Sequence, residues 1–337
     1  MRVGVSFKRA LPPKSLRPYS GAGGMSAYWG LLNRPEKDTW DLKPSPVSRL
    51  ELYTSGCGYP IELRGHMVNV RQAVILGAGL GSRFWGVLND RPKGFLKLGS
   101  SPIVEESIVK LLRAGISDIV IVTGYYHEFY DRLSEKYPLV RTVLNPEFAS
   151  TGSMLSLYTA ARYVNSDFLL LESDLVYEYK ALQTLQDFPE DTCILLSGKT
   201  GAGDEVYVGI SDDRVVNMSK RRDDITCLGG ELVGISKISL ELYAQMTDLA
   251  PEKYKHNRQY QYEDCLVDVS AKVAIHYQRL DNLAWIEIDD ENHLSRAREK
   301  IYPLVAQRDA GIVVPKSVER PIVLTPGPAA TTDVLKY

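Results

Sequence analysis

The stretch that decides the fold is residues 77–94, GAGLGSRFWGVLNDRPKG, which directly follow the apolar run QAVIL at 72–76. A short apolar run that leads into a glycine-rich turn is typical of a buried strand ending at the carboxyl edge of a parallel sheet. Helical and strand patterns then alternate, which indicates right-handed βαβ units. They predict helices over 102–115, 126–137 and 153–164 and strands over 118–125, 141–145 and 167–174.

The second half of the chain has a different pattern. Residues 206–219 and 227–236 read as strands with tight connections, which predicts a small antiparallel insertion. We expect helices near 240–246 and 262–273 and a last strand over 284–288. A helix over 289–302 should follow, because acids stand at its start and bases towards its end. The fold class expected is α/β, with a mostly parallel sheet flanked by helices.

Composition excludes several classes of protein. The 337 residues carry 40 basic and 42 acidic side chains, so no global field favours nucleic acid as a partner. No apolar run approaches the ~18 residues of a membrane span. The four cysteines, Cys57, Cys193, Cys227 and Cys265, lack zinc-ligand spacing and form no disulfide framework, so a cytoplasmic protein is expected.

The two ends of the chain differ from its middle. Residues 1–66 show neither a helical nor a strand period, and we expect a poorly ordered extension or a non-native start. The first 35 residues contain bases and no acid, as transit peptides do, yet their prolines disfavour an amphipathic helix. An upstream addition before Met67 is the simpler explanation. The expected divisions are a domain over 67–308 and a linker with the start of another domain over 309–337.

The glycine-rich turn fits neither common nucleotide motif. A dinucleotide fold needs GxGxxG and an acid about 20 residues later, and a P-loop needs GxxxxGK followed by Ser or Thr. A plain tight turn is the alternative, but Arg83 and Lys93 follow at a sheet edge where α/β proteins bind ligands. An arginine fork and a lysine point charge suit a triphosphate. The expected nucleotide-binding residues are Leu76, Gly77, Ala78, Gly79, Gly81, Ser82, Arg83 and Lys93.

The pattern G-x-G-x-R followed by P-K resembles the nucleotidyltransferases that activate sugars and alcohols with a nucleoside triphosphate. It consists of Gly79, Gly81, Arg83, Pro92 and Lys93, and the resemblance extends from about residue 70 to residue 301. It implies a Rossmann-like nucleotidyltransferase fold. It also implies attack on the α-phosphorus, with Lys93 neutralising developing charge and Arg83 holding the leaving pyrophosphate.

Two acids stand where predicted strands end. Asp174 closes LLLESD and Asp289 closes AWIEID; either alone would be interpreted as a cap or a solvated loop acid. They match the two metal-binding aspartates of the superfamily, the second within the E-I-D sequence of small-alcohol cytidylyltransferases. Mg²⁺ is therefore the expected cofactor. Glu172 and Asp290 are neighbouring candidates for the same role.

The acceptor side resembles that of phosphocholine and 2-aminoethylphosphonate cytidylyltransferases, on residues 145–162, NPEFASTGSMLSLYTAAR. Hydroxyls and amides at a helix start would receive an anionic group, although a plain capping run is the alternative. In QYQYEDCL, 259–266, carboxylates and rings would hold an ammonium group, and a solvated helix start is the alternative. The expected acceptor-binding residues are Ser150, Thr151, Gly152, Ser153, Lys220, Tyr262, Glu263 and Asp264.

The tail PIVLTPGPAATTDVLKY, 321–337, resembles the opening of pyridoxal-phosphate aminotransferases of the 2-aminoethylphosphonate and alanine-glyoxylate group. This implies a transferase covalently fused to an aminotransferase in a longer protein, and it favours 2-aminoethylphosphonate as the acceptor. The expected function is transfer of CMP from CTP to 2-aminoethylphosphonate, for decoration of lipids or glycans. Transfer to phosphocholine or phosphoethanolamine and a non-catalytic nucleotide-sensing module remain alternatives.

Overall fold

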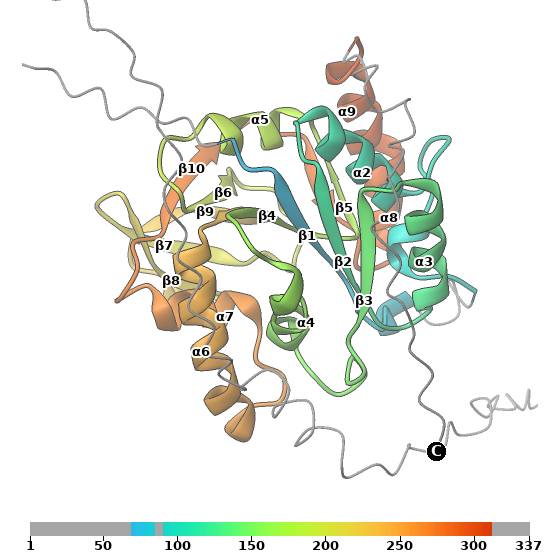
Figure 1. Ribbon diagram of the computed structural model, residues 1–337. Coiled ribbons are helices and arrows are strands. Elements are labelled where there is room, and N and C mark those ends of the chain that lie inside the picture. The colour runs from blue at the N-terminus through green and yellow to red at the C-terminus, as the bar shows by residue number, and fades with distance from the viewer. Residues whose placement is uncertain (1–68, 85–89, 312–337) are drawn as a thin grey trace, which may run out of the picture. The chain divides into compact units, whose positions relative to one another are not determined.

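The computed structural model describes residues 69–84 and 90–311 (Figure 1), which belong to one compact unit. The expectations for 1–66 and for most of 309–337 lie outside the described residues. The first strand, β1, spans Gln72–Gly77 and is buried at all six positions. A continuous apolar run of this kind forms a strand whose two faces are both covered.

The main sheet has nine strands in the order β3-β2-β1-β4-β9-β6-β10-β8-β7. Strands β1 to β4 pair in parallel with one another, as the alternating pattern predicts. This half of the sheet is visible in Figure 1 with β1 between β2 and β4. Apart from β1, the strands are β2 Asp118–Thr123, β3 Val140–Leu144, β4 Phe168–Glu172, β6 Cys193–Ser197, β7 Tyr207–Ser211, β8 Arg214–Ser219, β9 Leu228–Ile238 and β10 His276–Leu280.

The antiparallel insertion is confirmed, and one of its strands joins the two halves of the sheet. β9 pairs antiparallel with both β4 and β6, so it lies in the middle of the sheet. β7 pairs with β8 and also with β9, which closes β9, β6, β10, β8 and β7 into a ring. The eleven residues of β9 are long enough to serve both regions.

Helices cover both faces of the parallel strands. On one face Ile108 and Leu111 of α2 pack with Ala73 and Ile75 of β1. On the other face the ring of Phe168 contacts Tyr243 of α6, with 5.1 Å between centroids. None of the described helices is long and apolar enough to cross a membrane. The helices are α2 Ile103–Arg113, α3 His127–Lys136, α4 Ser153–Thr159, α5 Lys180–Asp187, α6 Leu240–His256, α7 Tyr262–Val269, α8 Glu291–Arg296 and α9 Tyr302–Arg308.

A separate two-stranded sheet positions the two predicted metal aspartates. The strand expected over 284–288 forms as β11, Trp285–Glu287, and pairs antiparallel with β5, Leu175–Tyr177, outside the main sheet. The backbone N–H of Ile288 donates to the carbonyl of Asp174 at 3.1 Å. Asp174 and Asp289 therefore come together although 115 positions separate them in the sequence.

Candidate active site

A cleft of about 360 Å³ opens at the carboxyl end of β1. Among the described residues of the turn, Gly81 does not line it. Ser82 begins the turn Ser82–Phe84, and Gly81 has a φ of +61°, where a Cβ would lie 3.2 Å from Cγ of Lys93. Glycine thus allows the turn to pass beside Lys93. The predicted nucleotide-binding residues on the wall are Leu76, Gly77, Ala78, Gly79, Arg83 and Lys93.

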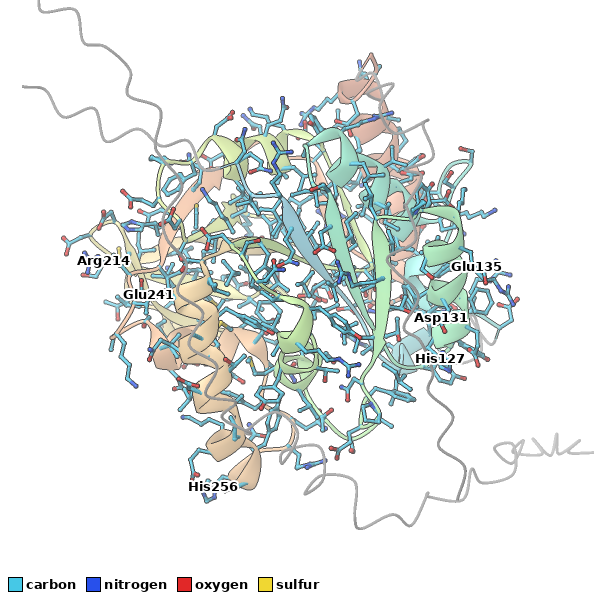
Figure 2. All side chains as sticks on the ribbon, viewed as in Figure 1. His127, Asp131, Glu135, Arg214, Glu241 and His256 are labelled. Atoms are coloured by element: carbon cyan, nitrogen blue, oxygen red, sulfur yellow. The ribbon has the colours of Figure 1, made fainter. Side chains whose placement is uncertain are left out.

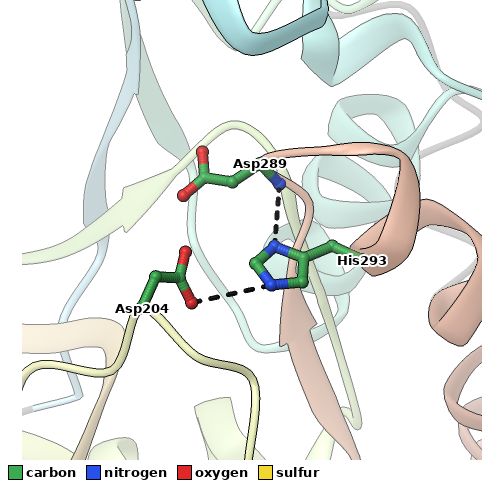
Figure 3. Close-up of side chains that lie close together, drawn as sticks. All are labelled: Asp204, Asp289 and His293. Carbon is green, nitrogen blue, oxygen red and sulfur yellow. Dashed lines mark hydrogen bonds and ion pairs between the residues drawn. The ribbon is translucent and has the colours of Figure 1, made fainter.

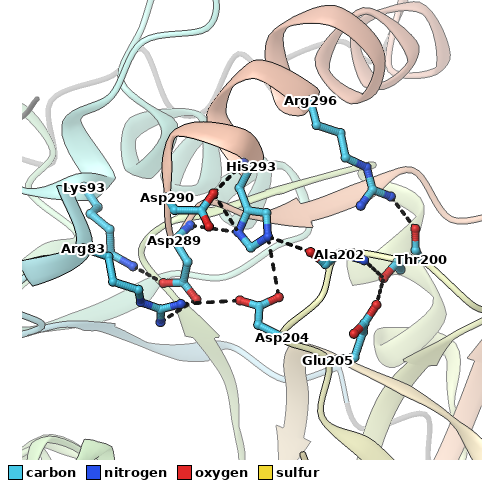
Figure 4. Close-up of polar contacts among 10 residues, drawn as sticks. All are labelled: Arg83, Lys93, Thr200, Ala202, Asp204, Glu205, Asp289, Asp290, His293 and Arg296. Carbon is cyan, nitrogen blue, oxygen red and sulfur yellow. Dashed lines mark hydrogen bonds and ion pairs between the residues drawn. The ribbon is translucent and has the colours of Figure 1, made fainter.

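Charged groups converge at one end of this cleft. The Lys93 ammonium donates to Asp289 Oδ1 at 2.6 Å and also forms an ion pair with Asp174. Arg83 reaches the other oxygen of Asp289 at 2.9 Å (Figure 4). Both aspartates are buried, whereas Arg83 is largely exposed. The structure therefore brings the four residues predicted for catalysis and metal binding into one cluster.

The pKa values in this cluster follow from burial and charge. Burial alone would lower the pKa of Lys93, but Asp174, Asp289 and then Glu287 outweigh it and raise that pKa above its ordinary range. Burial alone would raise the pKa of Asp289, but Lys93 overcomes this effect and holds the pKa at about 2. The ion pairs thus keep Lys93 and Asp289 charged at neutral pH.

Four glutamates line a smaller cavity of about 40 Å³ beside the cleft, the inner cavity, together with Asp204 and Arg296. Glu172 and Glu287 line both spaces, while Glu205 and Glu263 line the inner cavity. The hydroxyl of Tyr262 donates to Glu172 at 3.0 Å, and Oε2 of Glu263 is buried without a hydrogen-bond partner. Burial and the neighbouring carboxylates raise the pKa of Glu172 to about 8, and burial raises that of Glu263 to about 7.

The predicted acceptor residues divide between these spaces and the surface. Ser150 is exposed and does not line the cleft. Asp264 accepts a hydrogen bond from the N–H of Gln261 in a capping box at the start of α7. Lys220 is exposed, although its charge lowers the pKa of Glu263. Tyr262 reaches the inner cavity through Glu172. The residues on the cleft wall are Thr151, Gly152 and Ser153, with the N–H of Ser153 donating to Gln261 Oε1 at 3.0 Å.

Sequence reasoning missed Glu287, Asp204 and His293 near the cluster. His293 of α8 is buried, and its Nε2 lies 3.7 Å from Asp204 Oδ1; the pair is drawn in Figure 3. By contrast, His127 and His256 lie at the periphery of the molecule in Figure 2, and Nδ1 of His127 forms a hydrogen bond of 2.8 Å with Asp131. Neither Asp204 nor His293 stands in a recognisable motif; the available signal was the acid-capped helix start DDENH at 289–293.

The glycine-rich turn, the two cations and the facing aspartates form one candidate site beside an α/β sheet. Residues 73–207 match the family model of the MobA-like NTP transferase domain. The chain has the same fold as the inositol-1-phosphate CTP transferase from T. maritima, with a TM-score of 0.62 and 19% identity, over 73% of this chain and 98% of the other. The expected fold class is confirmed.

Two curated relatives are cytidylyltransferases. The chain is 25% identical to the 2-aminoethylphosphonate cytidylyltransferase of Lancefieldella rimae over 252 residues, 74% of this chain and 90% of that protein. It is 35% identical to the choline-phosphate cytidylyltransferase of Streptococcus pneumoniae over 99 residues, 29% of this chain and 43% of that protein. The first match thus extends over most of both proteins, whereas the second covers less than half of its relative.

Proposed function

We propose that this protein is a Mg²⁺-dependent cytidylyltransferase that transfers CMP from CTP to 2-aminoethylphosphonate and releases pyrophosphate. The nucleotidyltransferase fold and the similarity to cytidylyltransferases support the reaction class. The observation that supports this acceptor is the inner cavity, where the carboxyl groups of Glu172, Glu263 and Glu287 gather beside the cleft and can give up their protons when an ammonium group binds.

The residues of the cluster fit a divalent cation. In this structure the Lys93 ammonium stands between Asp174 and Asp289, so both carboxylates already face a positive charge. Glu172, Asp174 and Glu287 also offer oxygens within 4.8 Å of one another. Carboxylate oxygens are the ligands Mg²⁺ prefers, and Asp174 and Asp289 would hold it. When bound, Mg²⁺ supplies neutralisation of the triphosphate charge.

The reaction needs little from a general base. A phosphonate oxygen is ionised near neutral pH and attacks the α-phosphorus, forming one P–O bond while the bond to the β-phosphate bridging oxygen breaks. Lys93 neutralises negative charge that develops at the α-phosphate, and exposed Arg83 turns from Asp289 to the leaving pyrophosphate. Small residues Ala78 and Gly79 allow phosphates to approach the backbone.

The inner cavity favours a primary amine over a quaternary one. A buried carboxylate oxygen without a partner is costly, and an ammonium N–H would satisfy Oε2 of Glu263. A water needs about 10–15 Å³ of such volume, so about 40 Å³ admits an ammonium group. Three methyl groups would fill that space without donating any hydrogen bond. Phosphocholine is therefore the weaker candidate, although two relatives are choline-phosphate cytidylyltransferases.

The decisive experiment measures pyrophosphate release with Mg²⁺ and each of the four nucleoside triphosphates. Each is paired with 2-aminoethylphosphonate, phosphoethanolamine and phosphocholine. We expect turnover with CTP, and among the acceptors 2-aminoethylphosphonate should give the highest kcat/KM. Absence of pyrophosphate with every acceptor, despite CTP binding, would favour a nucleotide-sensing module instead.

The carboxylate assignment is tested with Glu263→Gln. This variant should raise the acceptor KM, measured with 2-aminoethylphosphonate, at least tenfold and leave the KM of CTP within about threefold. The tenfold change equals roughly 1.4 kcal/mol in acceptor binding. Glu252→Gln is the matched control, because Glu252 is exposed on α6. An unchanged acceptor KM in Glu263→Gln would contradict the amine assignment while leaving cytidylyl transfer intact.

A further inference from the structure

The loop over residues 198–206, between β6 and β7, is attached to α8 at two points. His293 Nε2 lies 3.1 Å from the carbonyl of Ala202. Arg296, one turn further along α8, donates to the carbonyl of Thr200 at 2.7 Å (Figure 4). Gly201 and Gly203 flank Ala202, and both have a positive φ that glycine adopts readily, so the loop turns sharply there. The two contacts from α8 hold this turn.

The other ring nitrogen of His293 faces the turn that carries Asp289. The backbone N–H of Asp289 points to Nδ1 at 3.4 Å (Figure 3), and the N–H of His293 donates to Asp290 Oδ1 at 2.8 Å. Nε2 faces a carbonyl, which can only accept, and Nδ1 faces the backbone N–H of Asp289. Both ring nitrogens are therefore engaged by backbone groups of the two segments. The ring acts as a spacer between Asp289 and the loop.

The loop in turn brings a carboxylate to the cluster. Asp204 Oδ2 lies 3.7 Å from Arg83, and its Oδ1 lies 3.7 Å from His293 Nε2. Arg83 is thus shared between Asp204 and Asp289. Arg83 faces Asp204 through Nη1 and Asp289 through Nη2, so one guanidinium serves both carboxylates. The loop thus adds a second carboxylate to the end of the site that holds Asp289.

We propose that His293 is a positioning residue for the cation and nucleotide end of the site, acting through Asp289 and Asp204. The inference rests on the proposed function. His293 fixes the Asp289 turn through its backbone and fixes the 198–206 loop so that Asp204 stands beside Arg83 and the Asp289 end of the site. Removing His293 releases both segments, and removing the charge of Asp204 takes a negative charge from this end of the site, so either change weakens cation binding. The glutamate Glu263, proposed to hold the acceptor amine, keeps its place.

The test uses the full chain and Mn²⁺ as the probe, measured by electron paramagnetic resonance with and without CTP. His293→Ala and Asp204→Asn should each weaken Mn²⁺ binding about tenfold and raise the KM of CTP by a larger factor than the KM of the acceptor. Asp204 also lines the inner cavity, and asparagine keeps the shape of its side chain there. The double variant should lose little more than either single one, because both act on the same contact.

Two further variants complete the set. His293→Gln should recover part of the affinity for Mn²⁺, since its amide can donate to the carbonyl of Ala202. His256→Ala is the control, because His256 lies at the exposed end of α6 and should bind Mn²⁺ as the parent does.

Several outcomes would overturn the inference. They are single variants that bind Mn²⁺ within twofold of the parent, fully additive losses in the double variant, or an equal rise in both KM values. If His293→Ala does not fold, Asp204→Asn alone still decides, because it alters a partly exposed loop residue. A parent protein that binds neither Mn²⁺ nor CTP refutes the proposed function itself, whereas a parent that binds both and variants that match it refute only the role of His293.

Discussion

Lys93 sits between two buried aspartates, and this position makes its charge more effective than that of a solvated lysine. Its ammonium contacts Asp174 and Asp289 in a partly buried site, where charge interactions are screened less than in water. Lys93→Ala should lower the rate of pyrophosphate release by about 10²–10³, the size of effect seen when one preorganised donor to a transition state is removed. Lys97→Ala is the matched control, because Lys97 is exposed four residues away.

Turnover of Lys93→Ala within about threefold of the parent would contradict a role in charge neutralisation. Asp174 and Asp289 lose their shared partner in this variant, which could disturb the fold. Circular dichroism therefore separates a loss of turnover caused by the missing charge from one caused by misfolding. Added Mg²⁺ should restore thermal stability of this variant, since the cation replaces the missing positive charge.

At the residue scale, sequence alone predicted the groups that stand in motifs. Arg83, Lys93 and the two aspartates follow strand ends or the glycine-rich turn, where local pattern and chemistry coincide. Asp204 and His293 could not be predicted, because their roles depend on contacts between segments about 90 positions apart. Glu287 had a local signal that was not used: it stands two residues before Asp289, and alternate residues of an extended strand share a face.

At the scale of elements, the space around a glycine indicates whether the fold or the ligand requires the missing side chain. Gly79 has no atom within 4 Å of where a Cβ would stand, so Gly79→Ala should leave the melting temperature within about 1 °C, as expected for a surface substitution outside any packing contact. The added methyl group stands in the nucleotide-binding region and should raise the KM of CTP. A lowered melting temperature with an unchanged KM would contradict this assignment.

Gly152 shows the opposite behaviour, because its space is already taken. A Cβ there would stand 2.4 Å from the carbonyl oxygen of Tyr260, and the N–H of Gly152 donates to the carbonyl of Arg258 at 2.9 Å. Gly152→Ala should therefore force α4 away from the loop before α7 and destabilise the protein by about 1–3 kcal/mol. Chemical denaturation measures this loss, and stability equal to that of Gly79→Ala would contradict the close contact between these segments.

The elements that sequence misplaced are those whose position depends on pairing. β9 reads as an ordinary antiparallel strand, yet it occupies the centre of the sheet because β4 and β6 both pair with it. β11 carries Glu287 towards the site through its pairing with β5, a three-residue strand with little signal of its own. Strand periodicity reports which residues are buried, but it does not report which partner buries them.

For the molecule as a whole, the buried carboxylates couple stability to pH. The pKa of Glu172 is about 8 and that of Glu263 about 7 in the folded protein, against an ordinary value of 4.5. The folded state therefore holds more protons than the unfolded chain between about pH 4.5 and 8. Stability from these groups is complete below about pH 4.5 and is lost as the pH rises through about 7 and 8. Asp289, with its pKa of about 2, acts in the opposite direction but at far lower pH.

We therefore expect the melting temperature of the ligand-free protein to fall between about pH 5.5 and about pH 8.5. The double variant Glu172→Gln with Glu263→Gln should flatten this dependence, because its neutral amides need no proton to be buried. Glu252→Gln should keep the slope of the parent, since Glu252 is exposed. Saturating 2-aminoethylphosphonate should also flatten it, because an ammonium group replaces the protons as the neutralising charge. A parent whose melting temperature rises over this range, or a double variant with an unchanged slope, would show that the glutamates around the inner cavity are neutralised by another group.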